Sequence, residues 1–386
     1  MRRNAQELTL LQILDCIRLN DGTSRVAIAR TLGISRATVT ESVRTLLSLG
    51  LVNEDVDLGR SPRNVRLHIN PTSALSLGID LSGSTLKALV VDRSLSVQAR
   101  LEFPQQSRPD HRTPEDILFD VIDALLTTLG PAKELVEGIG IAIPGLLSTD
   151  GETVIYAAPY DWHNVALSQL IRTRYGIAAS IVNDTHAMLL AEQLFFPQQL
   201  APSSLLLFVG EGIGGKIFIN GQIITGAHGF GGEWGHIVVK TEGAACQCGK
   251  KGCMESEFAI PRIVQKCQRI DRSILTWSDV VRTKDQSFVQ EILFDLADTT
   301  SRLLVGVVTF LDPQKIILQG PITEVSDVLI PALTSRLAAQ MLSQTGQTLQ
   351  ITTSALGSDA AAIGAAATIV AAGLMRNIQN ARKVEV

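Results

Sequence analysis

The sequence lacks the cysteine content of a secreted, disulfide-stabilised protein. Its 386 residues include five cysteines, an odd number, and three of them fall between residues 246 and 253. A disulfide framework usually needs an even number of cysteines spread along the chain. The polar start, residues 1–7, is followed by periodic rather than continuous apolar residues, so the sequence does not predict a secretory signal. We therefore expect a protein of the reducing cytoplasm.

A hydrophobic run long enough to span a bilayer is also missing. The longest uncharged apolar stretch extends from position 360 to position 375 and consists largely of Ala and Gly. It is shorter than the roughly 20 residues that a spanning helix needs. We expect no membrane insertion here and instead a closely packed core or interface helix. Aromatic residues are few, at 4%, and the contents of hydrophobic residues (45%) and charged residues (19%) are typical of a soluble α/β protein.

A large net charge is absent as well, because the formal charge is only -4 at pH 7. Spread evenly, that charge would argue against a nucleic-acid partner. The distribution is uneven, however: residues 1–70 contain ten Arg, no Lys and seven acidic residues, a net +3 that leaves -7 for the rest of the chain. A small basic segment joined to an acidic body favours separate partners, although chance variation in a short segment would give the same count.

Residues 1–70 have the pattern of a helix-turn-helix. Apolar residues recur with helical spacing from residue 8 to 19, and a second short helix is expected over 25–32, before Gly33, which tolerates the positive φ of a turn. Ser35 is a suitable N-cap for a third helix that runs to about residue 49. One side of that helix is apolar, and the other presents the hydroxyl and arginine side chains typical of a helix in the major groove.

The residues after this helix predict a wing. An extended segment starts at residue 51, a basic tip follows at 59–63, and residues 65–69 alternate apolar with polar. The alternative is a three-helix cap or dimerisation module. For the DNA-binding interpretation, the residues expected to contact operator DNA are Ser35, Arg36, Thr38, Thr40, Arg44, Arg60 and Arg63. Because one head has little excess charge, we expect two heads on a palindromic site, in a homodimer or homotetramer.

The remaining residues contain two similar strand-loop-strand units. The first covers residues 77–91, and the second covers residues 205–219. Each has a glycine-containing loop between two apolar segments, so two lobes with facing loops are predicted. Backbone amides in such loops can bind phosphate, but glycine also serves ordinary hairpins.

One cluster has the composition of a metal site. His236, Cys246, Cys248 and Cys253 are close together in the sequence and offer one imidazole and three thiolates. This Cys3His set is the usual closed arrangement of structural zinc, and the alternative is free buried cysteines. The sequence therefore predicts one structural zinc ion per chain.

Several motifs together resemble the ROK family of repressors, open reading frames and sugar kinases. Residues 232–236 read Gly-Glu-Trp-Gly-His, residues 246–255 carry the cysteines and an acid, and further matches lie at 143–145, 182–184 and 210–226. The resemblance covers essentially the whole chain, and the head is similar to that of the family's repressors for xylose and N-acetylglucosamine. It implies an α/β protein with an N-terminal winged helix-turn-helix and a two-lobed, actin-like, hexokinase-type (ribonuclease H-like) sugar-binding body.

The resemblance also implies domain limits and sugar ligands. The expected domains are 1–70 for the head, 71–195 for the first lobe, and 196–386 for the second lobe with the zinc site and oligomerisation surface. The expected effector-binding residues are Gly145, Asn183, Asp184, Glu233, His236 and Glu255. Carboxylates accept charge-assisted hydrogen bonds from sugar hydroxyls. The resemblance also implies that His236 holds zinc through one ring nitrogen and sugar through the other.

The nucleotide half departs from the family's kinases. The resemblance places Ser82 where the family's kinases carry glycine, and Glu211 where they usually carry a small or hydroxyl residue. Residues 318–321 lack the glycine pair of those kinases. A carboxylate beside a triphosphate is repulsive. We therefore predict a sugar-responsive repressor that has lost ATP binding, with residues 66–73 as the coupling linker.

Two alternatives stay open. One is an active ATP-dependent sugar kinase with a DNA-binding head, in which Asp184 would be the general base. The other is an architectural DNA-binding protein regulated by a protein partner. The sequence identifies neither the sugar nor the sign of its effect on DNA binding.

Overall fold

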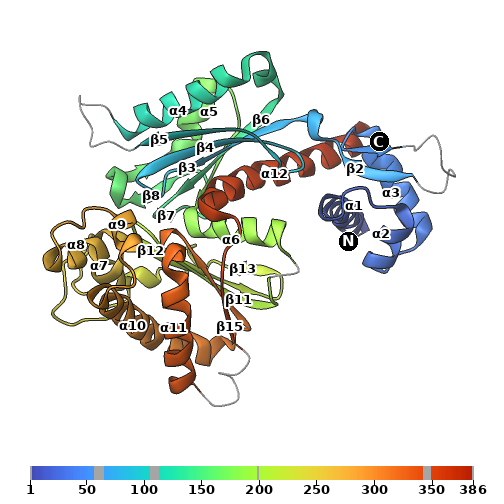
Figure 1. Cartoon of the computed structure of the whole chain (residues 1–386). Helices are drawn as coiled ribbons and strands as arrows, with labels where there is room; N and C mark the ends of the chain where they lie inside the picture. Colours follow the sequence, from blue (N-terminus) through green and yellow to red (C-terminus); the bar gives the residue numbers. More distant parts are fainter. Residues whose placement is uncertain (1, 56–64, 105–112, 198–199, 342–348, 385–386) are drawn as a thin grey trace.

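The computed structural model describes residues 2–55, 65–104, 113–197, 200–341 and 349–384, which form a head and two lobes (Figure 1). The head consists of α1 (Arg2–Leu19), α2 (Arg25–Leu32), α3 (Arg36–Ser48), β1 (Val52–Asp55) and β2 (Arg66–Ile69). The two strands pair antiparallel, and Gly33 makes the turn between α2 and α3 with φ 66°. These elements confirm the predicted winged helix-turn-helix.

The first lobe is built on a five-stranded sheet of order β10-β6-β3-β4-β5. Its strands are β3 (Leu75–Asp80), β4 (Thr85–Asp92), β5 (Val97–Pro104), β6 (Val136–Ile143) and β10 (Ala179–Asn183). Apolar residues of α4 (Pro114–Leu129) and α5 (Leu167–Tyr175) pack with this sheet in one core. A small sheet of β7 (Leu146–Leu147), β8 (Val154–Ala157) and β9 (Trp162–Val165) completes the lobe.

The second lobe repeats the same plan. Its sheet has the order β13-β12-β11-β14-β15, made of β11 (Ser203–Val209), β12 (Ile213–Ile219), β13 (Gln222–Ile224), β14 (Lys315–Gln319) and β15 (Gln350–Thr353). In both lobes an antiparallel three-stranded unit is extended by two parallel strands. The second core adds α7 (Met254–Phe258), α8 (Ile260–Ile270), α9 (Trp277–Arg282), α10 (Ser287–Leu311) and α11 (Ser326–Gln340). The repetition confirms the two predicted lobes.

Two helices form the layer between the lobes: α6 (Asp184–Phe195) and α12 (Ala360–Val384). Side chains are excluded where α12 meets its neighbours, since a Cβ atom at Gly140 would lie 1.9 Å from the oxygen of Ala365, and one at Gly364 would lie 1.9 Å from the oxygen of Ala187. By length and composition the segment Gly357–Asn380 could cross a membrane, but most of it is buried in the protein. It is the closely packed core helix that its Ala and Gly content predicts.

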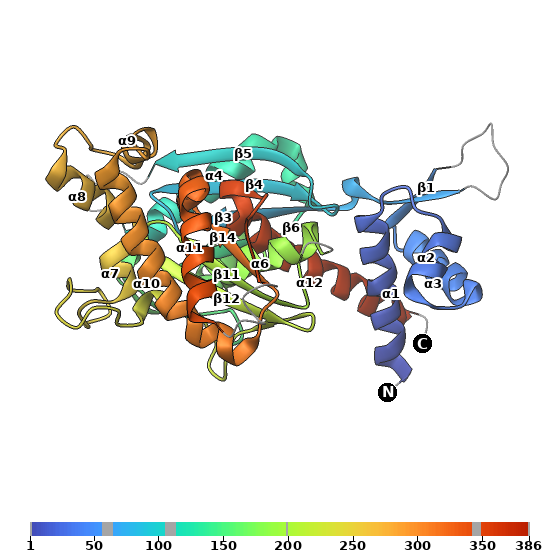
Figure 2. The ribbon, with the colours of Figure 1, turned by 60° about the horizontal axis from the view of Figure 1, so that its bottom comes forward.

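The far end of α12 reaches the head (Figures 1 and 2). Ile378 is buried in the same cluster as the apolar residues of α1, α2 and α3. The domain limits at residues 70 and 195 stay a prediction. The structure adds that the last helix of the chain, in the segment assigned to the second lobe, packs on the first sheet and on the head.

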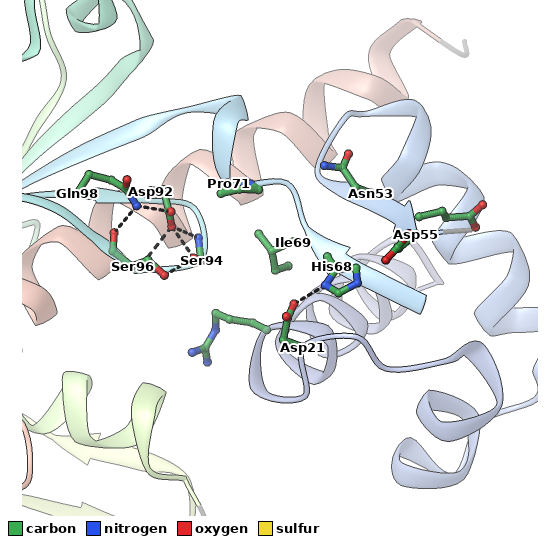
Figure 3. A pocket seen from close by; sticks show the side chains of 12 residues that line it. Asp21, Asn53, Asp55, His68, Ile69, Pro71, Asp92, Ser94, Ser96 and Gln98 are labelled. Atoms are coloured by element: carbon green, nitrogen blue, oxygen red, sulfur yellow. Dashed lines mark hydrogen bonds and ion pairs between the residues drawn. The ribbon is translucent and has the colours of Figure 1, made fainter. Parts of the chain in front are cut away.

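A groove of about 800 Å³ separates the wing from the first lobe (Figure 3). On the head side, His68 Nδ1 lies 2.8 Å from Asp21 Oδ1. On the lobe side, the turn between β4 and β5 is held by Asp92, whose carboxylate accepts the backbone N–H groups of Ser94 and Ser96. The predicted linker lies along this groove and contains the short 3-10 helix η2 (Pro71–Ser73).

Candidate functional site

The first turn of α3 presents polar side chains on the surface of the head. Ser35 caps the helix and accepts the backbone N–H of Thr38 at 3.1 Å, as its sequence position predicts. The residues predicted to contact DNA on this helix are all exposed: Ser35, Arg36, Thr38, Thr40 and Arg44. Within the described chain, neither Arg36 nor Arg44 has an ion-pair partner, so both guanidinium groups are available to phosphate or bases. Arg60 and Arg63 of the wing lie outside the described residues.

The first-lobe part of the candidate sugar site is centred on the N-terminus of α6. Asn183 caps this helix and accepts the backbone N–H of His186 at 3.2 Å, while its amide donates to the oxygen of Gly145 at 3.3 Å. A Cβ atom at Gly145 would lie 2.3 Å from the oxygen of Tyr156, so this position excludes a side chain. The structure therefore joins two of the predicted sugar residues directly.

Asp184 follows as the first residue of α6 and is only 8% exposed. One carboxylate oxygen accepts the backbone N–H of Thr185 at 2.8 Å. Burial, together with the negative charges of Asp80 and Glu233, raises the pKa of Asp184 to about 7, against the opposing effects of this hydrogen bond and Lys216. Asp184 therefore titrates near neutral pH, and its ionised form can accept a proton or bind a hydroxyl group.

Three predicted residues come from the second lobe. Glu233 precedes the 3-10 helix η5 (Trp234–His236), and burial raises the pKa of Glu233, as does the nearby charge of Glu255. Glu255 lies on α7, where one oxygen accepts the backbone N–H of Ile213 at 3.0 Å. Glu233 lies near enough to Asp184 of the first lobe for its negative charge to raise the pKa of Asp184. The candidate site thus draws on both lobes.

Sequence reasoning missed a buried cation beside these acids. Lys216 lies on β12 and is 1% exposed, and its ammonium donates to the oxygen of Gly231. Burial lowers the pKa of Lys216, and the negative charges of Glu233 and Asp184 oppose that lowering. The signal in the sequence was a lone lysine inside an otherwise apolar strand.

The four predicted metal ligands converge. The ligand atoms of His236, Cys246, Cys248 and Cys253 all lie within 4.8 Å of one another. Cys246 Sγ is 3.5 Å from His236 Nδ1, and Cys248 Sγ is 3.6 Å from Cys253 Sγ. Metal–ligand bonds of about 2.3 Å to sulfur and 2.0 Å to nitrogen place tetrahedral donors roughly 3.5–3.8 Å apart. The residues therefore fit a tetrahedral metal ion, bound on the Nδ1 side of His236.

The two glycine loops of the lobes carry polar side chains that lie near each other. Ser82 turns back onto Asp80, with its hydroxyl 2.6 Å from Oδ1. In the facing loop, burial raises the pKa of the Glu211 carboxyl, and the nearby Ser84 hydroxyl opposes that rise. Polar side chains of the two loops therefore lie near each other, at the loops that in the family's kinases are expected to hold phosphate.

Comparisons with known proteins match the head and the body separately and also both together. A family model described as "ROK family" matches residues 76–372, and one described as "Winged helix-turn-helix DNA-binding" matches residues 7–53. The chain is 25% identical over 373 residues to the xylose repressor of Bacillus subtilis (strain 168), covering 95% of this chain and 94% of that protein. It is 27% identical over 360 residues to the N-acetylglucosamine repressor of Escherichia coli O6:H1, covering 90% and 88%.

Kinases and solved structures also match. A glucokinase of Halalkalibacterium halodurans is 27% identical over 305 residues, covering 75% of this chain and 92% of that protein. The crystal structure of a ROK family transcriptional regulator, a homologue of the E. coli MLC protein, superposes with a TM-score of 0.81 at 23% identity, over 99% of this chain and 100% of that chain. This likeness confirms the predicted fold class.

Proposed function

Because the chain belongs to the ROK family and carries a winged helix-turn-helix head, we propose that it is a sugar-responsive repressor of carbohydrate-utilisation genes in the cytoplasm. One observation carries the proposal: the same chain combines an exposed recognition helix with a polar site that draws on both lobes. The similarity to repressors named for xylose and N-acetylglucosamine supports it.

The DNA partner is a palindromic operator bound by two copies of the chain. The exposed first turn of α3 enters the major groove, and Arg36, Thr38 and Arg44 contact bases or phosphates, with Ser35 and Thr40 beside them. Arg60 and Arg63 extend the contact from the wing. A homodimer supplies the two heads, and a homotetramer would supply two pairs.

The sugar binds between the lobes. Asn183 and Asp184 hold it from the first lobe with the backbone of Gly145, while Glu233, His236 and Glu255 hold it from the second. Because these groups lie on opposite lobes, a ligand that bridges them favours a closed arrangement. Sugar binding weakens the binding of the repressor to its operator if the closed arrangement of the lobes differs from the arrangement that fits DNA.

Two helices connect that site to the head. α6 begins at Asp184, and near its other end the oxygen of Leu194 accepts a hydrogen bond from Arg18 of the head at 2.8 Å. α12 packs against α6 at Gly364 and contributes Ile378 to the core of the head. A shift of α6 on sugar binding therefore acts on α1 directly, and the groove beside the linker gives the head room to reorient (Figure 3).

We assign structural zinc to the Cys3His cluster, one ion per chain. Three thiolates and an imidazole are the donors that zinc prefers. A metal ion bound there would supply no reaction chemistry, but it would fix the ring of His236. Held through Nδ1, the ring of His236 would keep Nε2 free to bind a sugar hydroxyl.

Operator binding in the presence of sugars tests the proposal. The experiment is a fluorescence-anisotropy titration of the full chain on its operator, repeated with pentoses, hexoses and N-acetylhexosamines. We expect at least one sugar to weaken operator binding tenfold or more. Operator affinity that no sugar changes would reject the effector role.

A second function, ATP-dependent sugar phosphorylation, is favoured by Asp184 and by the similarity to a glucokinase. In that case Asp184 would take the proton of the attacking hydroxyl. The position of Glu211 near Ser84 supports the loss of this activity, because a carboxylate then lies at the loops that would face phosphate. Phosphorylation of a sugar by the wild-type chain, abolished by Asp184→Asn, would establish the kinase.

A further inference from the structure

Lys216 is a buried lysine on the face of β12 that packs against α6. Along β12, Gly214, Lys216 and Phe218 share one face, because side chains alternate along a strand. That face meets α6, since a Cβ atom at Gly214 would lie 3.0 Å from Thr185 Cγ2 and Phe218 packs in the same cluster as Ala187. The lysine therefore reaches the space beside the first turn of α6.

The Lys216 ammonium is incompletely satisfied by the described residues. It has three N–H donors and is 1% exposed, and its one hydrogen bond to a described residue goes to the oxygen of Gly231. No carboxylate among the described residues lies within the 4.0 Å of an ion pair. A buried ammonium needs acceptors, and a positive charge near a helix N-terminus is unfavourable. Two of the three donors thus have no hydrogen-bond acceptor among the described residues.

Acids surround this cation at a longer distance. Asp184 and Glu233 attract Lys216 without touching it. A hydroxyl group placed between them could accept from the ammonium and donate to a carboxylate at once. A sugar hydroxyl has both capacities.

The charge around this space selects among sugars. Together with burial, the negative charges of Asp80 and Glu233 raise the pKa of Asp184, and the positive charge of Lys216 lowers it. A divalent ion held by the neighbouring Cys3His cluster would add no positive charge, because the three thiolates would outweigh it. A phosphate or carboxylate on the ligand would therefore meet an excess of negative charge.

We propose that the effector is an uncharged sugar, and that Lys216 is a specificity-determining residue that donates to one of its hydroxyl oxygens while Asp184 or Glu233 accepts the proton of the same hydroxyl. This inference rests on the proposed function and narrows it to the neutral members of the sugar class.

Calorimetry on the full, zinc-loaded chain tests the charge selection. The ligands are xylose, glucose, mannose and N-acetylglucosamine, each compared with its own phosphate and, where one exists, its uronic acid. We expect a neutral sugar to bind at least tenfold more tightly than its charged derivatives. A charged derivative that binds more tightly than its neutral parent overturns this inference and leaves the repressor function standing. If no sugar of either charge binds, both the inference and the effector role fail.

The variant Lys216→Met tests the residue, with Lys133→Met, an exposed lysine, as the control. Loss of a charged hydrogen bond should weaken binding of the neutral sugar about 10- to 100-fold. The melting temperature without sugar should fall, because the buried Asp184 and Glu233 lose the cation that opposes their charge. Unchanged sugar affinity refutes the assignment. Deoxy analogues then separate a lost contact with the sugar from a general loss of structure.

Monodeoxy analogues locate the hydroxyl. One analogue should bind the wild-type protein at least tenfold more weakly than the parent sugar. Its loss should be clearly smaller in Lys216→Met, because only the hydrogen bond from that hydroxyl to the carboxylate remains to be lost there. An equal loss for both proteins with every analogue would contradict contact between Lys216 and a hydroxyl.

Discussion

Replacing Arg18 by methionine should uncouple the head from the sugar site. The side chain of Arg18 is 12% exposed, and its guanidinium donates to the oxygen of Leu194 at 2.8 Å. Methionine keeps much of the apolar volume and removes the donor. In the proposed mechanism this bond carries the movement of α6 to α1, so its loss should leave sugar binding intact and reduce its effect on DNA.

The size of the effect follows from that single bond. A hydrogen bond from a charged donor contributes about 1.5–3 kcal/mol. The ion pair of Arg18 with Asp15 is 3.5 Å long and mostly exposed on the Asp15 side, so it adds little. If the bond to α6 exists in only one arrangement of the head, its loss changes the coupling by about 10- to 100-fold, since about 1.4 kcal/mol is a factor of ten.

The assay compares operator dissociation constants with and without saturating sugar. For Arg18→Met we expect the ratio of the two constants to approach one, with sugar affinity within twofold of wild type. Arg30→Met, which removes an exposed arginine of the same head, is the control: it can weaken DNA binding but should keep the ratio. A wild-type ratio in Arg18→Met would refute transmission through this contact.

Three further predictions concern the metal, the acid and the DNA-binding face. Cys248→Ser should lower the metal content measured by mass spectrometry together with the sugar response, and a full response without metal would refute the structural role. Asp184→Asn should raise the melting temperature above pH 7 and raise it much less near pH 4. Because the pKa of Asp184 is raised from 3.8 to about 7 in the folded state, its ionisation destabilises the fold increasingly as the pH rises between those values. The cost is about 1.4 kcal/mol per pH unit. An equal shift at both pH values would contradict this origin. Arg36→Ala should weaken operator binding about tenfold without changing calorimetric sugar binding, whereas unchanged operator affinity would place Arg36 outside the interface.

Local chemistry made the head predictable. Gly33 and Ser35 are near neighbours in the sequence, and each acts locally. Gly33 adopts the positive φ of the turn, and the side chain of Ser35 caps the next helix. The metal cluster was predictable for the same reason, because its four ligands lie in one short segment that begins at His236 and ends at Cys253.

The candidate sugar site and its connections to the head depend on residues that are far apart in the sequence. Asn183 and Glu233 could be associated only through the family resemblance, since nothing in their local sequence relates them. Lys216 escaped notice because a lone lysine in a strand carries no sign of its partners. The contact between Arg18 and Leu194 joins positions 176 residues apart, so only the packed structure reveals it.

The position of Ile378 also orders events during synthesis. N-terminal domains generally fold first as a chain leaves the ribosome. Here the core of the first domain includes a side chain from the last helix. A chain whose translation stops before α12 therefore lacks Ile378 in the core of the head, so its DNA-binding domain should be less stable than that of a chain that includes this helix.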